Sequence, residues 1–257
     1  MLGALIGDYV GSVYEWRNHK HKDFEPFYSL RSFFTDDSVL TVAVADALLN
    51  DRSYANSFKD WGRRYPNSGW GGRFHVWLFS DNTEPYNSFG NGSAMRCSPT
   101  GFLAKTLEQA LELATASAIP THDHPEGVKG AQAVAAAIHL ARQGMDIKKI
   151  QYTVMEISGY DLDRTVDEIR VDYRFNETCQ GSVPEALICA FEANDFEDAI
   201  RNAISIGGDS DTIAAIAGGI AEARFGIPEH LSTHVWQKMP DDMRAVMQSL
   251  YALEKRN

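Results

Sequence analysis

Apolar residues recur three and four positions apart along most of this chain, which is the spacing of amphipathic α-helices. In residues 36–50, for example, Val39, Leu40, Ala43 and Ala47 fall on one side of a helix. The same periodicity predicts helices over residues 103–118, 125–142, 146–158, 183–193, 196–206, 210–224 and about 241–255. Residues 171–175 give the only strand prediction, so the pattern favours an all-α fold.

The first twelve residues are apolar and small, and three glycines divide them regularly. Gly3, Gly7 and Gly11 lie about one helical turn apart, which predicts a buried helix packed closely against a neighbour. Asp8 interrupts the segment well short of a membrane span, and no cationic stretch precedes it as in a signal peptide. We therefore expect a core helix here and no membrane association.

The rest of the chain shows no sign of division into parts. It has no linker-like tract, low-complexity segment or fixed-period repeat, so we expect a single domain over residues 1–257. The longest irregular stretch, residues 65–100, is rich in glycine, proline, asparagine and serine, and a loop of that length is usually functional. Residues 210–224 are crowded with alanine and glycine, which indicates a central helix. The expected architecture is an all-α domain with an elaborate loop face.

Charge narrows the possible functions. The 257-residue chain has 35 acidic and 24 basic residues, a formal net charge of −11 with neutral histidines. This excess argues against general nucleic-acid binding, which needs a basic face, but it allows a small phosphorylated ligand in a local pocket.

The three cysteines, Cys97, Cys179 and Cys189, have the spacing of neither a disulfide framework nor a zinc site. We therefore expect a cytoplasmic protein, and a monomer by default.

Two acidic motifs stand at predicted helix starts, Thr35-Asp36-Asp37-Ser38 and Gly207-Gly208-Asp209-Ser210-Asp211-Thr212. Either motif alone is explained by helix capping, because Thr, Ser and Asp accept hydrogen bonds from the first N–H groups of a helix. Together they supply four carboxylates, which would repel one another in one pocket unless cations neutralise them. Oxygen ligands of this kind suit Mg²⁺ or Mn²⁺, and their number suffices for two ions that share a bridging carboxylate. Capping and a metal centre both stay open on these residues alone.

Three further segments carry polar groups that could meet a ligand. Glu15 lies among aromatic residues just after the glycine-spaced helix, and the basic run of residues 17–22 is either a solvated loop or a contact for an anion. Residues 88–96 form a glycine-rich turn that matches neither a P-loop nor a dinucleotide fingerprint. The two histidines within residues 121–125 lack a third ligand at zinc spacing, so we expect a helix-start turn with one polar side chain toward a pocket.

Five motifs follow one another along the chain in a specific order. They are Gly3-Ala4-Leu5-Ile6-Gly7-Asp8 with Glu15, Phe34-Thr35-Asp36-Asp37-Ser38, Gly90-Asn91-Gly92-Ser93-Ala94-Met95-Arg96, Thr121-His122-Asp123-His124-Pro125 and Gly207-Gly208-Asp209-Ser210-Asp211-Thr212-Ile213. Together they resemble the ADP-ribosylglycohydrolase family over nearly the whole chain, from Gly3 to about Pro228. The resemblance implies an all-α, orthogonally packed domain with a binuclear Mg²⁺ centre, or with Mn²⁺ in its place.

The resemblance also implies which residues hold the metals and move the proton. The implied metal ligands are Thr35, Asp36, Asp37, Asp209, Asp211 and Thr212. Glu15 corresponds to a loop carboxylate that some members of the family bring near the metals for catalysis. Asp36 is the second candidate for the general base, and the sequence does not decide between the two.

For the substrate, the resemblance implies contacts with the parts of ADP-ribose. The implied contacts are Ser88, Phe89, Gly90 and Gly92 at the diphosphate and ribose, His122 at the phosphoribose and, as a looser match, Tyr86 at the adenine. Residues 161–178 match nothing in the family pattern, so we expect the substrate-selecting loops to differ there.

The implied activity is hydrolysis of the C1″ glycosidic bond of an ADP-ribosyl adduct, with release of ADP-ribose. Two cations would orient the 2″- and 3″-hydroxyls of the distal ribose, and water would attack C1″ through an oxocarbenium-like transition state. The leaving group stays open among arginine, serine, a nucleic-acid base and the acetyl ester. The alternatives are a non-enzymatic ADP-ribose or nucleotide binder on the same scaffold and a metal-dependent phosphohydrolase.

Overall fold

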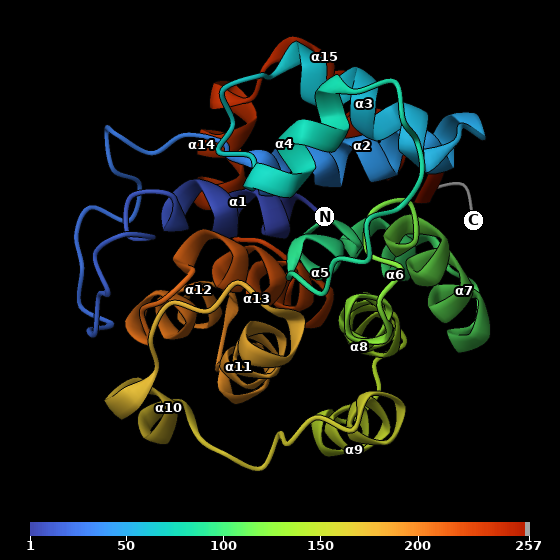
Figure 1. Cartoon of the computed structure of the whole chain (residues 1–257). Helices are drawn as coiled ribbons and strands as arrows, with labels where there is room; N and C mark the ends of the chain where they lie inside the picture. The colour runs from blue at the N-terminus through green and yellow to red at the C-terminus, as the bar shows by residue number, and fades with distance from the viewer. Residues whose placement is uncertain (255–257) are drawn as a thin grey trace.

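The computed structural model describes residues 1–254 of the chain. Over that range it forms fifteen α-helices, α1 to α15, and no β-sheet (Figure 1). An isolated antiparallel bridge joins Gly90 to Thr178. None of the helices in these residues is both long and apolar enough to span a membrane. The prediction of an all-α fold is confirmed.

The helices differ widely in length. Their bounds are α1 (Leu2–Gly11), α2 (Asp36–Asn50), α3 (Tyr54–Arg64), α4 (Gly72–Phe79), α5 (Gly92–Arg96), α6 (Ser98–Leu103), α7 (Leu107–Ala118), α8 (Pro125–Arg142), α9 (Ile147–Ser158), α10 (Val166–Asp172), α11 (Cys179–Glu192), α12 (Phe196–Ser205), α13 (Ser210–Phe225), α14 (Glu229–Lys238) and α15 (Asp241–Glu254). Helices α2 and α8 match their predicted ranges at both ends, and α9, α12 and α13 agree within one residue. The predicted end of the last helix, residue 255, lies outside the described residues.

Four sequence predictions were wrong in part or in full. The helix expected over residues 183–193 begins four residues earlier, at Cys179, so Pro184 lies inside α11. The predicted helix over residues 103–118 is broken after α6, because Thr106 starts α7 by accepting a hydrogen bond from Gln109 N at 3.2 Å. The predicted strand over residues 171–175 does not form. A capping box of Thr165 and Glu168 starts α10, and this helix continues through Asp172. The irregular stretch of residues 65–100 contains α4, α5 and the beginning of α6.

Helices α1 and α13 lie at the centre of the fold in backbone contact (Figure 1). A Cβ atom added at Gly3 would lie 2.2 Å from the carbonyl oxygen of Gly218, and one added at Gly7 would lie 1.9 Å from that of Ala214. No side chain fits at such distances. Every residue of α1 is buried, as are residues 210–221 of α13. The buried N-terminal helix and the central position of α13 are therefore confirmed.

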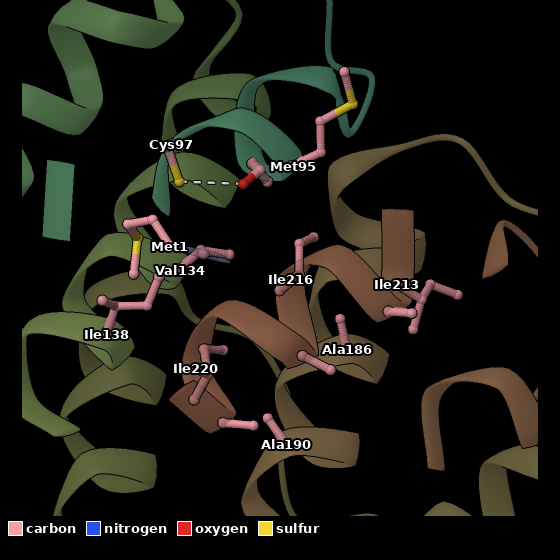
Figure 2. Close-up of a cluster of buried hydrophobic side chains, with 14 of the residues drawn as sticks. Met1, Met95, Cys97, Val134, Ile138, Ala186, Ala190, Ile213, Ile216 and Ile220 are labelled. Carbon is pink, nitrogen blue, oxygen red and sulfur yellow. Dashed lines mark hydrogen bonds between the residues drawn. The ribbon is translucent and has the colours of Figure 1, made fainter. Parts of the chain in front are cut away.

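The core around α13 consists of small and branched aliphatic side chains from α8, α11 and α13. Figure 2 shows this cluster, in which Val134, Ile138, Ala186, Ala190, Ile213, Ile216 and Ile220 are all buried. Alanines on α8 and α11 let these helices approach α13 closely, so the isoleucines fill the space between them. The N-terminal end of α13 is thus fixed by packing along the whole helix.

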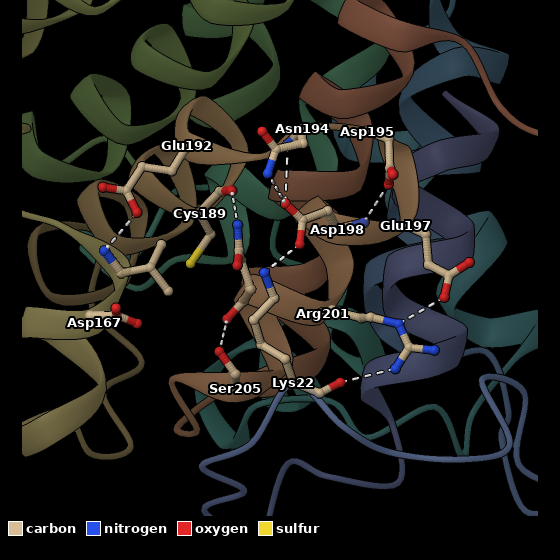
Figure 3. A network of polar contacts seen from close by, with 12 residues as sticks. Lys22, Asp167, Cys189, Glu192, Asn194, Asp195, Glu197, Asp198, Arg201 and Ser205 are labelled. Atoms are coloured by element: carbon tan, nitrogen blue, oxygen red, sulfur yellow. Dashed lines mark hydrogen bonds and ion pairs between the residues drawn. The ribbon is translucent and has the colours of Figure 1, made fainter.

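Residues 12–35 connect α1 to α2 without a regular helix, and charged groups tie them to α12 (Figure 3). Arg201 Nη1 donates to the carbonyl oxygens of Lys22 at 2.9 Å and Phe24 at 3.1 Å. Its Nε donates to Glu197 Oε1 at 2.7 Å, and Lys22 forms an ion pair with Asp198. The connection is therefore held on the surface of α12, close to the start of α13.

Candidate metal centre and ligand cavity

Carboxylates from three helices and the α1–α2 connection meet at the N-terminal ends of α2 and α13. One oxygen each from Asp8 of α1, Asp37 of α2 and Asp211 of α13 lies within 4.8 Å of the other two. A second group, with the same limit, joins Asp211 to Asp209 and to Glu15 of the connection. Because Asp211 belongs to both groups, the two acidic motifs of the sequence form one cluster.

The N-terminal end of α2 is held by an acid from another helix. Asp8 accepts hydrogen bonds from Thr35 Oγ1 at 2.7 Å, Thr35 N at 2.9 Å and Ser38 N at 3.1 Å, and a further one from Ser38 Oγ. Thr35 Oγ1 in turn accepts from Asp37 N at 3.3 Å. Capping therefore explains Thr35 and Asp8, but it does not explain the Asp37 carboxylate. Asp37 Oδ1 is buried without a hydrogen-bond partner in the described part of the chain.

The start of α13 is tied to the glycine-rich turn and to α2. It follows a turn at residues 207–208, two glycines whose φ angles of +72° and +78° lie in the left-handed region. Asn91 Nδ2 donates to Asp209 Oδ2 at 2.7 Å. Thr212 Oγ1 donates to Asp37 Oδ2 at 3.2 Å, so the two helix starts bond to each other directly.

The cluster is strongly desolvated and holds no cationic side chain. Burial raises the pKa values of the Asp36, Asp37 and Asp209 carboxyls well above their usual range, and repulsion from Asp211 adds to the effect. Burial also raises the pKa of Asp211 itself. Burial, followed by neighbouring charges, also raises the pKa of two other members to about 7, those of Asp8 and Glu15.

No lysine or arginine of residues 1–254 forms an ion pair with any of these six acids. The donor set consists of carboxylate and hydroxyl oxygens, one of which, Asp37 Oδ1, has no other partner. Such a set fits a hard divalent cation, because hard cations prefer oxygen ligands and would relieve the repulsion.

A cavity of about 480 Å³ lies over this cluster. Its lining contains most of the predicted site residues: Glu15, Asp36, Asp37, Tyr86, Ser88, Phe89, Gly90, Gly92, His122, Asp209, Asp211 and Thr212. Thr35 is the exception, and it lies beneath the cavity between Asp8 and Asp37. A larger cavity of about 700 Å³ lies beside Trp236 and Tyr251, but Glu222 is the one carboxylate in its described lining. Acidity therefore marks the smaller cavity as the functional candidate.

His122 faces the glycine-rich turn. A Cβ atom at Gly92 would lie 3.2 Å from His122 Nε2, while His122 Nδ1 lies 2.7 Å from Thr121 Oγ1. Burial, followed by the charges of Arg96 and Arg73, lowers the pKa of His122 well below 6.5. The ring is therefore neutral at neutral pH, with Nε2 directed toward the turn.

Two arginines that were not among the predicted site residues also line the cavity. Arg96 is fully buried, and its Nη2 donates to Thr121 Oγ1 at 2.8 Å. Its Nε and Nη1 have no hydrogen-bond partner among the described residues. The Arg73 guanidinium lies 4.9 Å from the ring centre of Tyr86. Arg96 ends the glycine-rich motif, which was the available signal, whereas Arg73 had none.

Asp8 is the other functional candidate that sequence reasoning missed. Asp8 ends the first family motif without an assigned role there, yet it is fully buried and holds the start of α2. The available signal was a single acid in a helix of small, apolar residues, where a carboxylate is costly unless it has partners.

Comparison with known proteins gives one consistent family. A family model described as ADP-ribosylglycohydrolase matches residues 1–257. The ADP-ribosylarginine hydrolase Tri1 of Pseudomonas putida is 29% identical over 279 residues, which cover 93% of this chain and 74% of that protein. Human ADP-ribosylhydrolase ARH3 is 26% identical over 310 residues, 89% of this chain and 85% of ARH3.

The fold is also similar to a solved structure. A chain of an "ADP-ribosylglycohydrolase-related protein complex" superposes with a TM-score of 0.74 and 23% identity. The match covers 98% of this chain and 95% of that one. The predicted fold type is therefore confirmed along with the all-α class.

Proposed function

The chain belongs to the ADP-ribosylglycohydrolase family, and from this membership we propose that it hydrolyses the C1″ glycosidic bond of an ADP-ribosyl adduct and releases ADP-ribose. The observation that carries the proposal is a cluster of carboxylates, with which no lysine or arginine of residues 1–254 pairs, at a cavity that also contains the glycine-rich turn and His122. Tri1 and ARH3 are named as hydrolases of ADP-ribosyl compounds, which supports the same reaction class. The match from residue 1 to residue 257 supports a single domain.

We propose two Mg²⁺ ions, or Mn²⁺ in their place, as the cofactors. Their ligands would be Thr35, Asp36, Asp37, Asp209, Asp211 and Thr212. When bound, the ions would neutralise the buried carboxylates and polarise hydroxyl and water oxygens. Asp8 has a different role in this proposal, because Thr35 and Ser38 already donate to both of its oxygens. It orients the start of α2.

Glu15 is the proposed acceptor of the proton that the attacking water loses. It is only partly buried, it lines the cavity, and its carboxylate lies beside those of Asp209 and Asp211. Asp36 lines the same cavity and is the second candidate for this role. Glu15→Gln and Asp36→Asn, compared at saturating substrate and saturating Mg²⁺, would separate the two roles, since a lost base lowers kcat without weakening metal binding.

The remaining cavity residues would hold the ADP-ribose part. The turn around Gly90 and Gly92 suits the diphosphate, because glycines let a ligand approach the backbone closely. Ser88 Oγ, which accepts from Gly90 N at 3.2 Å, lines the cavity beside Phe89. His122 Nε2, directed at that turn, suits the phosphoribose. Tyr86 offers an aromatic ring for adenine, and Arg96 adds a buried positive charge near the anionic ligand.

A panel of adducts tests the activity and identifies the leaving group. Purified protein with Mg²⁺ would be given ADP-ribosylarginine, ADP-ribosylserine, an ADP-ribosylated nucleobase and O-acetyl-ADP-ribose, each with an EDTA control. We expect release of ADP-ribose from at least one adduct, and none in EDTA. Binding of ADP-ribose by calorimetry without turnover of any adduct would indicate a binding protein, and EDTA-resistant turnover would contradict the metal centre.

A further inference from the structure

Glu15 lies on a segment that has no helix to hold it in place. Residues 12–17 form turns and residues 18–20 have no regular structure, yet Glu15 reaches the carboxylates of Asp209 and Asp211. A side chain on such a segment is positioned only as well as the segment is anchored. The anchors of residues 12–22 therefore decide where Glu15 lies.

Lys20 forms a polar anchor of this segment next to the cavity. Its Nζ donates to the carbonyl oxygen of Ile206 at 2.5 Å and to that of Tyr173 at 2.6 Å. Ile206 directly precedes residues 207–211, which contain Asp209 and Asp211, and Tyr173 begins the segment that continues to Thr178 at the cavity. One ammonium group thus joins three separate parts of the chain at the site.

Lys20 has no carboxylate partner among the described residues, so its contacts are made to backbone oxygens alone. An ammonium group has three donors and no acceptor, and charged donors make stronger hydrogen bonds to carbonyl oxygens than neutral ones do. The two carbonyls lie at the ends of α12 and α10, where helix carbonyls lack intrahelical partners. The charge of Lys20 therefore favours both contacts.

The three joined segments also fit together without spare room. A Cβ atom at Gly207 would lie 2.4 Å from Asn18 Oδ1, and one at Gly208 would lie 2.5 Å from the Tyr173 ring. Both glycines have positive φ angles, so substitution there would be strained even with more space. The segment that carries Glu15 thus packs directly on the turn that precedes Asp209.

A second contact closes the same segments at the edge of the cavity. The rings of Trp16 and Phe175 stack with centroids 5.1 Å apart and an interplanar angle of 18°. Both rings line the cavity, although Trp16 is 79% exposed. Phe175 belongs to residues 161–178, the region that matched nothing in the family pattern.

We propose that Lys20 is the positioning residue that holds Glu15 beside Asp209 and Asp211, assisted by the Trp16–Phe175 stack. The part of this inference that concerns catalysis rests on the proposed function, in which Glu15 handles the proton. The structural part, that Lys20 fixes residues 12–22 over the cavity, rests on the contacts alone.

The test compares Lys20→Met with Lys22→Met. The two lysines lie on the same segment and the two substitutions are chemically identical, but Lys22 pairs with Asp198 on the surface of α12. For Lys20→Met we expect kcat to fall about 100-fold, because small misplacements of a reacting group cost about that much, with less change in KM. Amide hydrogen exchange should become faster in residues 13–20 and 173–178 of the metal-free protein. Lys22→Met should match the parent in both measurements, and Lys20→Arg should restore part of the loss.

Each outcome decides a separate statement. If Lys20→Met and Lys22→Met show the same exchange and the same kcat, the inference is wrong while the proposed function stands. If the parent hydrolyses no adduct, the proposed function fails, and the exchange comparison alone decides whether Lys20 fixes the segment. If Lys20→Met does not fold by circular dichroism, Lys20→Gln serves instead, because its shorter, neutral side chain loses the charge and the reach of Lys20. Unchanged exchange over the same residues in Lys20→Gln would then overturn the inference.

Discussion

Helix α2 buries acidic side chains at both of its ends, and the two ends satisfy them differently. Near the C-terminal end, Asp46 accepts hydrogen bonds from Arg52 Nη1 at 2.7 Å, Asn50 Nδ2 at 2.8 Å and Trp61 Nε1 at 3.0 Å. At the N-terminal end, Asp37 has hydroxyl and carboxylate neighbours, and no cation among the described residues pairs with it. One helix thus provides two buried acids for comparison. Asp46 has a cationic side chain as a partner, and Asp37 has none among the described residues.

The difference separates an acid whose charge is balanced within the fold from acids that we propose as metal ligands. A buried charge is tolerable when cationic and polar partners replace its lost hydration, which is the situation of Asp46. A group of carboxylates that face one another has a repulsive free energy that only protons or cations relieve. Burial alone therefore does not distinguish the two ends of α2, whereas the presence or absence of a cationic partner does.

Removing one acid from each end should give the largest contrast. Asp211→Ala should lower turnover about 1000-fold or more, since a lost metal ligand costs several kcal/mol of transition-state stabilisation, and the protein should stay folded. Asp46→Ala should keep turnover per folded molecule but lose about 2 kcal/mol of unfolding free energy, because the buried Trp61 Nε1 and the Arg52 guanidinium lose their acceptor. Urea unfolding and turnover, measured on the same preparations, check both. Equal effects on turnover would contradict the distinction between the two ends.

Divalent cations should stabilise only proteins with an intact acidic cluster. At a concentration about 100 times Kd, a ligand that binds the folded state alone adds about 2.7 kcal/mol, which raises Tm by several degrees for a chain of this size. We expect that shift with Mg²⁺ in the parent and in Asp46→Ala, and none in Asp211→Ala. Thermal melts with EDTA or Mg²⁺ measure it, and an equal shift in all three proteins would indicate binding elsewhere.

The metal-free protein should lose stability as the pH rises. The pKa of Asp8 and that of Glu15 are about 7 in the folded protein, against 3.8 and 4.5 for free groups. Between about pH 4 and pH 7 the folded state therefore binds more protons than the unfolded state, so the unfolding free energy falls as the pH rises through this window. Urea unfolding in EDTA from pH 5 to pH 8 should show the fall, and saturating Mg²⁺ should reduce it. Burial lowers the pKa of His122, which acts in the opposite direction, so the slope is compared with that of Asp211→Ala. A parent slope no more negative than that of Asp211→Ala would refute the repulsion at the N-terminal end.

The smallest effect is expected near the C-terminal end of α2, where Arg52 pairs with Asp46. Trp61→Phe removes the indole N–H that donates to Asp46 but leaves Arg52 and Asn50 in place. We expect a loss of about 1 kcal/mol in unfolding free energy, with turnover and the Mg²⁺-induced shift in Tm unchanged. A change in metal affinity would show that the two ends of α2 are coupled.

The sequence predicts the helices that have strong apolar periodicity or clear end signals. Helix α8, for example, begins at Pro125 after a capping His124 and was predicted at both ends. Helix α4 was not predicted, because it starts at Gly72 within a stretch rich in glycine and asparagine, where local composition favours a loop. Its Trp77 and Leu78 form a helix because they pack into the core, which is a tertiary effect.

The candidate site shows a similar difference between residues that form a motif and residues that stand alone. The motifs at residues 35–38 and 207–212 are readable because several oxygen ligands stand together in the sequence. Asp8 and Lys20 are single residues whose partners lie far away in the sequence. Asp8 accepts from Thr35, which precedes α2, and Lys20 donates to Ile206, which follows α12. Only the folded chain brings those partners near, so the sequence does not show what Asp8 and Lys20 bind.

The glycine contacts of α1 also fix the rotational phase of that helix. Its glycine face cannot turn away from α13, since the two backbones are already in contact at Gly7. Asp8 follows Gly7 and therefore points about 100° around the axis, toward α2. Inserting one residue between them would rotate Asp8 by a further 100° or so and separate it from Thr35. The length of this segment is thereby constrained, because the contact with α13 and the hold on α2 both depend on the angle between Gly7 and Asp8.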